Sequence, residues 1–210
     1  MSFEHESEAM LEEKLIKHLV LLLFLGNLLR NFLILKEICN SNEEFKNSKQ
    51  GYHFTSISQD LISENTKQDI YFYNGIYFST LYVNGEYYSS RWYYSNTKKG
   101  ISKSADLEEE YNFDETSELS NYIENASYND ATLISNMPSN NVIAELLKHY
   151  LFKPITSKDG NYIIKYGNST WYINTKTKFI TKYTPDKDTT FEYAIDFDNI
   201  SESDVSKDNL

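Results

Sequence analysis

The residues that most often carry chemistry are few in this chain and widely spaced. Its four histidines and single cysteine lie in different segments, as His5, His18, His53, His149 and Cys39. A nucleophile needs a base and an orienting group beside it, and a metal site needs several ligands close together. The sequence also contains no Gly-x-Ser-x-Gly, His-Glu-x-x-His, P-loop or dinucleotide motif. We therefore predict a protein that is not an enzyme and that uses no cofactor and no metal.

The amino-acid composition limits the kinds of partner that this protein can bind. Lys and Arg number 20 against 31 Asp and Glu, for a net charge of −11, and only two residues are arginine. A nucleic-acid-binding surface needs a basic patch, so nucleic acid is excluded as a partner. The single cysteine excludes an internal disulfide. Hydrophobic residues make up 40% of the chain, which is enough to build a folded core.

An apolar segment at residues 15–35 allows three interpretations. A membrane-spanning helix needs roughly 20 apolar residues, but Arg30 and Asn31 interrupt this one, and a central arginine costs about 2.5–3.5 kcal/mol. A secretory signal fits the length of Leu19–Leu25, although no small-x-small cleavage site follows. The third interpretation is a long helix that packs on a core. Cys39 lacks the small residues of a lipid-attachment box, so we expect a free buried thiol.

Beyond this apolar segment the sequence follows a strand pattern. Asn74-Gly75 and Asn84-Gly85 each lie between aromatic or β-branched runs, which is the sequence signature of a type I′ hairpin. The pattern predicts a meander of the segments Asp69–Tyr73, Ile76–Val83 and Glu86–Ser95. The polar stretch Asn40–Gln50 is predicted to be a connection.

Two-residue loops fix the register, so Tyr73 should face Ile76 and Val83 should face Glu86. One face of the meander then collects Ile70, Phe72, Tyr77, Leu81, Val83, Tyr88, Trp92 and Tyr94. The other collects Tyr71, Tyr73, Ile76, Phe78, Tyr82, Tyr87, Arg91 and Tyr93. The first face is the drier, and we assign it to the interior; the second is a tyrosine-rich surface.

Helical spacing returns between the meander and the C-terminal third. Leu119, Tyr122, Ile123 and Ala126 recur at helical intervals, and a clearer amphipathic helix is predicted over 139–152. The acidic run Glu108–Glu110 is predicted to be a solvated loop.

Strands return after residue 160. A third two-residue turn, Gly167-Asn168, joins Tyr162–Tyr166 to Ser169–Ile173, and Lys178–Thr184 and Thr189–Phe197 follow. In the last strand Phe191, Tyr193, Ile195 and Phe197 should point inward.

Together these elements predict an α+β fold, a curved antiparallel sheet (half-barrel) with helices covering one face, plus an N-terminal apolar helix. Residues 1–40 are predicted to form an acidic N-terminal segment followed by the apolar helix, which is a possible signal or anchor. Residues 41–210 form a single sheet domain with a helical insertion at 114–153.

The C-terminal third resembles a known family. The sequence from Asn161 to Tyr183 contains a hairpin followed by Tyr-Ile-Asn-Thr-Lys-Thr, and this resembles the "Tyr-Ile-Asp-x-Lys-Thr" strand pair of LolA-like lipoproteins, closest to those of low-GC Gram-positive bacteria. The pattern match covers about fifty residues. The resemblance implies a half-barrel whose helices form a lid over a cavity for acyl chains or other hydrophobic ligands.

This resemblance leads to a functional expectation. We expect a non-enzymatic, extracytoplasmic protein, membrane-associated or secreted, that binds a lipid or other hydrophobic molecule. The expected lining is Ile70, Phe72, Tyr77, Leu81, Tyr88, Trp92, Leu146 and Leu147. The alternatives are a structural or protein-interaction module with a filled core, and a cytoplasmic location. Membrane association would occur through residues 15–35.

Overall fold

The computed structural model describes residues 2–47, 51–60, 64–94, 96–104, 106–112, 142–198 and 200–206. Two α-helices and one 3₁₀ helix lie in these ranges: α1 (Ser2–Asn47), α3 (Val142–His149) and η1 (Glu202–Val205). The strands are β1 (Tyr52–Asp60), β2 (Thr66–Tyr73), β3 (Ile76–Val83), β4 (Glu86–Tyr94), β5 (Lys99–Ser104), β6 (Leu107–Asn112), β7 (Thr156–Lys158), β8 (Asn161–Tyr166), β9 (Ser169–Asn174), β10 (Ile180–Thr184) and β11 (Thr189–Asp196).

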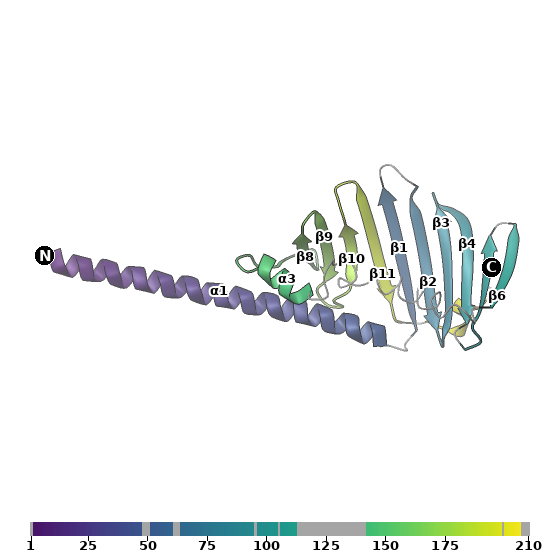
Figure 1. The fold of residues 1–210 in the computed structure, drawn as a ribbon, viewed down its shortest axis with the longest axis horizontal. Coiled ribbons are helices and arrows are strands. Elements are labelled where there is room, and N and C mark those ends of the chain that lie inside the picture. The colour runs from purple at the N-terminus through teal and green to yellow at the C-terminus, as the bar shows by residue number, and fades with distance from the viewer. Residues whose placement is uncertain are drawn as a thin grey trace.

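All of these strands belong to one open sheet. Its order is β6-β5-β4-β3-β2-β1-β11-β10-β9-β8-β7, with every neighbouring pair antiparallel. The edge strands β6 and β7 lie at opposite ends, so the sheet is not closed into a barrel (Figure 1). Strand β1, which the sequence analysis did not identify, joins the two meanders by pairing with both β2 and β11. The predicted α+β class with an antiparallel sheet is confirmed.

The asparagine-glycine turns form as predicted. Asn74 and Gly75 have φ values of 49° and 78°, and Asn84 and Gly85 have 52° and 84°. Both central residues of a type I′ turn need positive φ, which these two residue types tolerate best. The flanking pairs Tyr73–Ile76 and Val83–Glu86 are those predicted.

A β-bulge in β4 overturns the predicted faces beyond the second turn. Tyr82 pairs with Tyr87 but Leu81 pairs with Ser89, so Tyr88 is an extra residue in its strand. One inserted residue moves every later side chain to the opposite face. Trp92 and Tyr94 therefore share a face with Phe78 and not with Tyr77, while Arg91 and Tyr93 move to the face of Tyr77.

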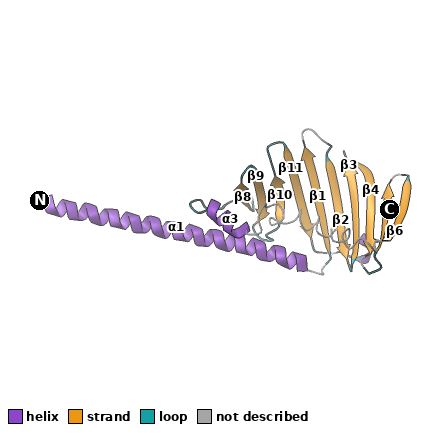
Figure 2. Ribbon diagram, in the orientation of Figure 1, coloured by secondary structure: helices purple, strands orange, loops and turns teal. Residues whose placement is uncertain are grey.

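The main core lies between the helices and one face of the sheet, which we call the inner face. It contains Phe54, Ile70, Tyr77, Tyr93, Ile164, Trp171, Ile173, Ile180 and Tyr193 from the strands, with Leu35, Ile38, Phe45, Val142 and Leu146 from the helices. The predicted inward residues Phe191, Ile195 and Phe197 also pack against this core. α3 lies beside α1 near β8 and β9 (Figure 2).

A smaller cluster lies on the opposite, outer face. Phe78 and Trp92 stack there at 4.8 Å between ring centroids, and Val205 of η1 covers them. Trp92 is only 2% exposed, and neither of the described α-helices, α1 and α3, belongs to its cluster. The C-terminal η1 therefore shields this tryptophan, in place of the predicted helix at 139–152.

This arrangement gives a direct test in a Trp171→Phe background, where Trp92 alone reports. Val205→Asp would place a charge against the stacked rings and displace η1, so we expect iodide quenching of Trp92 to rise clearly. Leu147→Asp acts on the inner side and should leave the quenching unchanged. Stern–Volmer measurements on both variants check this. The reverse order of quenching would contradict the assignment of Trp92 to the outer face.

Several predicted boundaries change. α1 continues through the predicted connection to Asn47, because Asn42 and Phe45 are buried against the sheet domain. The domain boundary at residue 40 is therefore wrong, since α1 supplies part of the sheet domain's core. Glu108–Glu110 lies in strand β6, where negative charge on an edge strand discourages pairing with other chains.

The helical predictions are tested only in part. α3 is observed at Val142–His149, inside the predicted helix at 139–152. The helix predicted around Leu119–Ala126, and most of the insertion at 114–153, lie outside the described residues. The predicted strands at 178–184 and 189–197 are observed as β10 and β11, with slightly shorter bounds.

Candidate functional site

The two halves of α1 have opposite environments. In the C-terminal half Leu35, Ile38 and Phe45 are 1%, 0% and 7% exposed and belong to the main core. The packed-helix interpretation therefore holds for this half. Cleavage anywhere between residues 31 and 45 would remove side chains that the sheet domain needs for its interior.

The N-terminal half extends away from the sheet (Figure 1). Its large apolar side chains are exposed: Leu15, Ile16, Leu19, Val20, Leu21, Leu22, Leu23, Leu25, Leu29, Phe32 and Leu33. By length and composition α1 is a helix that could cross a membrane. Phe152, which follows α3 and is 79% exposed, extends this surface, with its ring 5.3 Å from that of Phe24. We call this set the apolar arm.

Asn31 fixes the point at which the arm leaves the domain. Its side chain donates to the carbonyl oxygens of Tyr150 (3.1 Å) and Lys153 (2.9 Å) and accepts from the Ile155 N–H (2.9 Å). Asn31 is fully buried, so these bonds have little competition from water. The residue that the sequence presents as an obstacle to membrane insertion is thus the one that joins α1 to the segment after α3.

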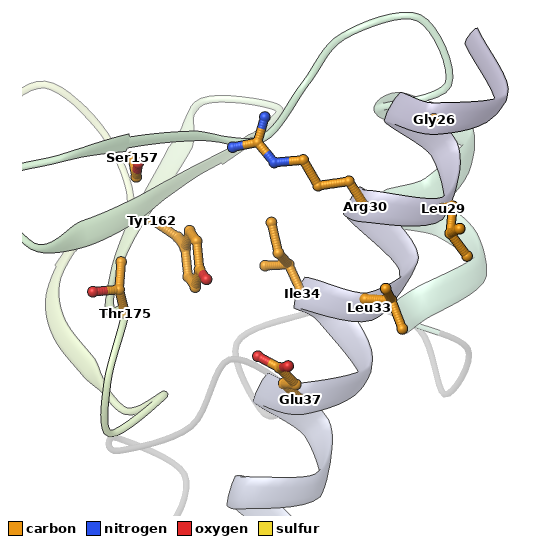
Figure 3. Close-up of a pocket in the computed structure, with 9 residues that line it drawn as sticks. All are labelled: Gly26, Leu29, Arg30, Leu33, Ile34, Glu37, Ser157, Tyr162 and Thr175. Atoms are coloured by element: carbon orange, nitrogen blue, oxygen red, sulfur yellow. The ribbon is translucent and has the colours of Figure 1, made fainter. Parts of the chain in front are cut away.

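An open groove of about 510 Å³ lies beside α1, next to Asn31. One wall is α1, the other is formed by β7, β8 and the turn after β9, and the lining is Gly26, Leu29, Arg30, Leu33, Ile34, Glu37, Ser157, Tyr162 and Thr175. Ligand sites commonly have about 300–1,000 Å³, so the groove has room for an acyl chain. Figure 3 shows Ile34 and Tyr162 facing each other across it, with Arg30 reaching over the mouth toward Ser157.

Charges lie at both ends of the groove. At one end Lys178 Nζ lies 2.8 Å from the Glu37 carboxylate and 5.0 Å from the centre of the Tyr162 ring. Burial lowers the pKa of Lys178, but its contacts with Glu37 and Tyr162 outweigh this and raise it overall. At the other end Arg30 is exposed, with Nη2 3.4 Å from the Ile155 carbonyl oxygen. The groove therefore combines an apolar wall with a neutralised pair and an exposed guanidinium.

The predicted ligand-binding residues do not form one site. Ile70, Phe72, Tyr77, Leu146 and Leu147 all belong to or pack against the main core. The side chains of α1 fill the inner face beside them.

The remaining three predicted residues lie apart from that core. Trp92 is on the outer face, Tyr88 is 61% exposed at the bulge, and Leu81 is half-buried near the same end of the sheet. The groove residues were missed because their proximity depends on how α1 crosses β7 and β8, for which the local sequence carries no pattern.

A polar cluster on the outer face is the other candidate for chemistry. Asp69 Oδ1 accepts from Thr55 (2.8 Å) and contacts His53 Nε2 (3.3 Å), while Asp69 Oδ2 lies 2.7 Å from Lys67 Nζ. The His53 ring stacks on Tyr71 at 4.1 Å. The Thr55 hydroxyl donates its proton to the Asp69 carboxylate and not to the His53 imidazole. A catalytic hydroxyl must instead donate to the base that will remove its proton. The cluster is therefore better suited to holding β1 against β2.

Asp69 makes the stability of this cluster depend on pH. Burial raises the pKa of Asp69, but the bonds from His53, Lys67 and Thr55 outweigh it and hold the pKa well below its usual range. A depressed folded pKa contributes stability above the unfolded value of about 3.9, and this is lost as pH falls through the folded pKa. We expect Asp69→Asn to cost about 1–3 kcal/mol at pH 6, and the gap to wild type to narrow progressively as the pH falls below about 4. Urea unfolding at several pH values checks this; a constant gap would contradict it.

Cys39 lacks the features of a reactive thiol. Cys39 is half-buried, where a buried thiol was predicted, and burial followed by the nearby Glu43 raises its pKa, which disfavours the reactive thiolate. Within the described part of the chain, no three His, Cys, Asp or Glu side chains are placed to hold a metal ion.

Comparison with known proteins gives no family for this chain. No protein-family model matches its sequence, and no curated protein matches it either.

Proposed function

We propose that this chain is a membrane-anchored, non-enzymatic protein that binds a hydrophobic ligand, a lipid or acyl chain, beside its anchor. The observation that carries the proposal is the apolar arm. A helix that is apolar all round needs burial on every side, and lipid supplies this. A second copy would cover only one stripe, and Leu19 and Leu21, which are both exposed and lie on opposite sides of the helix, would not both be covered.

The composition of the arm, more than its length, supports an anchor. Leu15–Leu29 is about 22 Å long at 1.5 Å per residue, which is shorter than the roughly 30 Å of a bilayer core, so it reaches across most of the hydrocarbon layer and not all of it. Lys14 and Lys17 lie at its far end, where their long side chains can reach lipid headgroups, and Lys17 is paired with Glu13 at 2.6 Å. Because the C-terminal half of α1 is core, cleavage within that half would remove core side chains, which supports a retained anchor over a cleaved signal.

The groove supports the assignment of a hydrophobic ligand. It lies where the arm meets the sheet domain and has an apolar wall that the arm continues. The resemblance of the Asn161–Tyr183 strand pair to a family of lipid-binding half-barrels points to the same ligand class. We therefore place the ligand in the groove beside α1, and not against the sheet face that the sequence predicted.

One observation favours a structural or protein-interaction module instead. Leu35, Ile38 and Leu146 are fully buried against the inner face, so helices occupy the place that a cavity would take. In that case native mass spectrometry of the purified chain would detect no bound lipid, and no acyl probe would bind.

The sheet domain is proposed to lie outside the cytoplasm. The family resemblance supports an extracytoplasmic position of the sheet domain. Basic residues are more numerous after the arm (Arg30, Lys36, Lys46) than before it (Lys14, Lys17), which taken alone favours the opposite orientation. Protease added to intact cells decides between the two, since only an outer domain would be digested.

Alkaline extraction of membranes tests the anchor. Wild type should stay in the membrane pellet with an intact N-terminus. The double variant Leu21→Asp, Leu22→Asp should move to the soluble fraction, because each change costs about 3–4 kcal/mol of insertion free energy. Tyr88→Asp, Leu107→Asp is the matched control, since it replaces two exposed apolar residues of the sheet and should stay with the membrane. A mature start anywhere between residues 16 and 45, or a wild type that is fully extracted, would contradict the proposal.

A further inference from the structure

The groove has a notch in its apolar wall. Gly26 lines it, and a Cβ added at this position would meet no heavy atom within 4 Å. Leu29 and Leu33 continue the same wall along α1. Both leucines belong to the apolar arm, so the wall is continuous with the surface assigned to the membrane. Open space along such a wall suits an extended alkyl chain.

The mouth of the groove presents a positive charge. Glu37 and Lys178 neutralise each other at 2.8 Å. Within the described residues the Arg30 guanidinium has no carboxylate in contact, and its one hydrogen bond is the long 3.4 Å contact to a carbonyl oxygen. A guanidinium presents paired N–H donors that match the oxygens of a phosphate group. The groove therefore complements an anionic phosphate joined to an apolar chain.

We propose that this groove binds an anionic phospholipid, with its phosphate at Arg30 and one acyl chain along Gly26, Leu29 and Leu33. The inference rests on the proposed function, because the arm must place the groove at a bilayer surface. Lipid then enters from the same membrane by lateral movement, without crossing water. A soluble organic phosphate has the same charge but would leave the apolar wall exposed to water.

Native mass spectrometry of the delipidated full chain, titrated in non-ionic detergent with dioleoylphosphatidylglycerol, tests the site. We expect one lipid per wild-type chain, about tenfold weaker binding in Arg30→Gln, and partial recovery in Arg30→Lys, which keeps the charge but not the paired donors. Gly26→Leu fills the notch without a clash and with better helix propensity, so it should weaken binding about fivefold or more without loss of folding. Lys158→Gln, an exposed basic residue outside the groove lining, should bind like wild type.

The outcomes separate the two proposals. Equal binding by wild type, Arg30→Gln and Gly26→Leu would overturn the phospholipid site. Displacement of the lipid by glycerol 3-phosphate alone would identify a soluble anion site and would overturn it as well. Flotation of the reconstituted chain with vesicles tests the anchor independently. A wild type that floats but retains no phosphatidylglycerol contradicts the groove assignment only, whereas a wild type that does not float overturns the anchor and the lipid site together.

Discussion

Replacing Ile38 with aspartate is expected to abolish the folded sheet domain. Ile38 is fully buried in the main core, between α1 and the inner face. The change removes a large apolar side chain and buries a charge without a partner, at a combined cost on the order of 5 kcal/mol or more. That is comparable with the whole stability of many domains, about 5–15 kcal/mol. Near-ultraviolet circular dichroism of the full chain in detergent should lose its aromatic signal.

The same substitution on the other half of α1 is the matched control. Leu22 is 66% exposed on the apolar arm, so Leu22→Asp should keep the aromatic signal while weakening retention by membranes. The pair separates folding from anchoring within a single helix. If Ile38→Asp keeps a native spectrum, the C-terminal half of α1 is not part of the core, and a cleaved leader becomes the better interpretation.

Asn31→Leu is expected to cost about 3–5 kcal/mol of unfolding free energy. Leucine has a similar volume, but it leaves the Lys153 carbonyl and the Ile155 N–H without their partner, and the Tyr150 carbonyl with only the long 3.4 Å bond from the Lys153 N–H. Each such group carries a desolvation penalty of about 1–3 kcal/mol when unpaired. Urea unfolding followed by tryptophan fluorescence measures the change, since Trp171 lies in the same core.

Asn27→Leu provides the comparison for Asn31→Leu. Asn27 lies one turn earlier on α1, is half-buried, and shows no hydrogen bond among the described residues. We expect a change within about 0.5 kcal/mol for this variant. Equal effects of the two substitutions would mean that helix propensity or detergent contact, and not the three bonds of Asn31, determines the loss.

Much of the sheet could be predicted because its information is local. The turns at Asn74-Gly75, Asn84-Gly85 and Gly167-Asn168 follow from the conformations that these residues tolerate, and alternation assigns Tyr193 to the interior. The bulge at Tyr88 carries no such signature. One extra residue in β4 moved Trp92 to the outer face, and with it one member of the predicted ligand lining.

The candidate site was the least predictable part of the chain. Arg30 and Glu37 lie on one helix and Ser157, Tyr162 and Thr175 on distant strands and turns, so only the crossing of α1 over β7 and β8 makes them neighbours. Residues so far apart in sequence leave no periodic pattern. Asn31 interrupts the apolar run, but nothing in the sequence predicted its contact with the segment after α3.

The sequence by itself determined the strand turns, the antiparallel pairing and the presence of a long apolar helix, because turn conformation and side-chain alternation depend on neighbouring residues. Only the tertiary structure decided how that helix is divided. The side chains of Ile34, Leu35, Ile38 and Phe45 are buried by α3 and by strands that lie far along the chain. Most large apolar side chains from Leu15 to Leu29 are exposed, although Phe24 contacts Phe152 and Leu29 lines the groove. Burial depends on the whole arrangement of the chain, so apolar side chains of one helix serve as core in its C-terminal half and as exposed apolar surface in its N-terminal half.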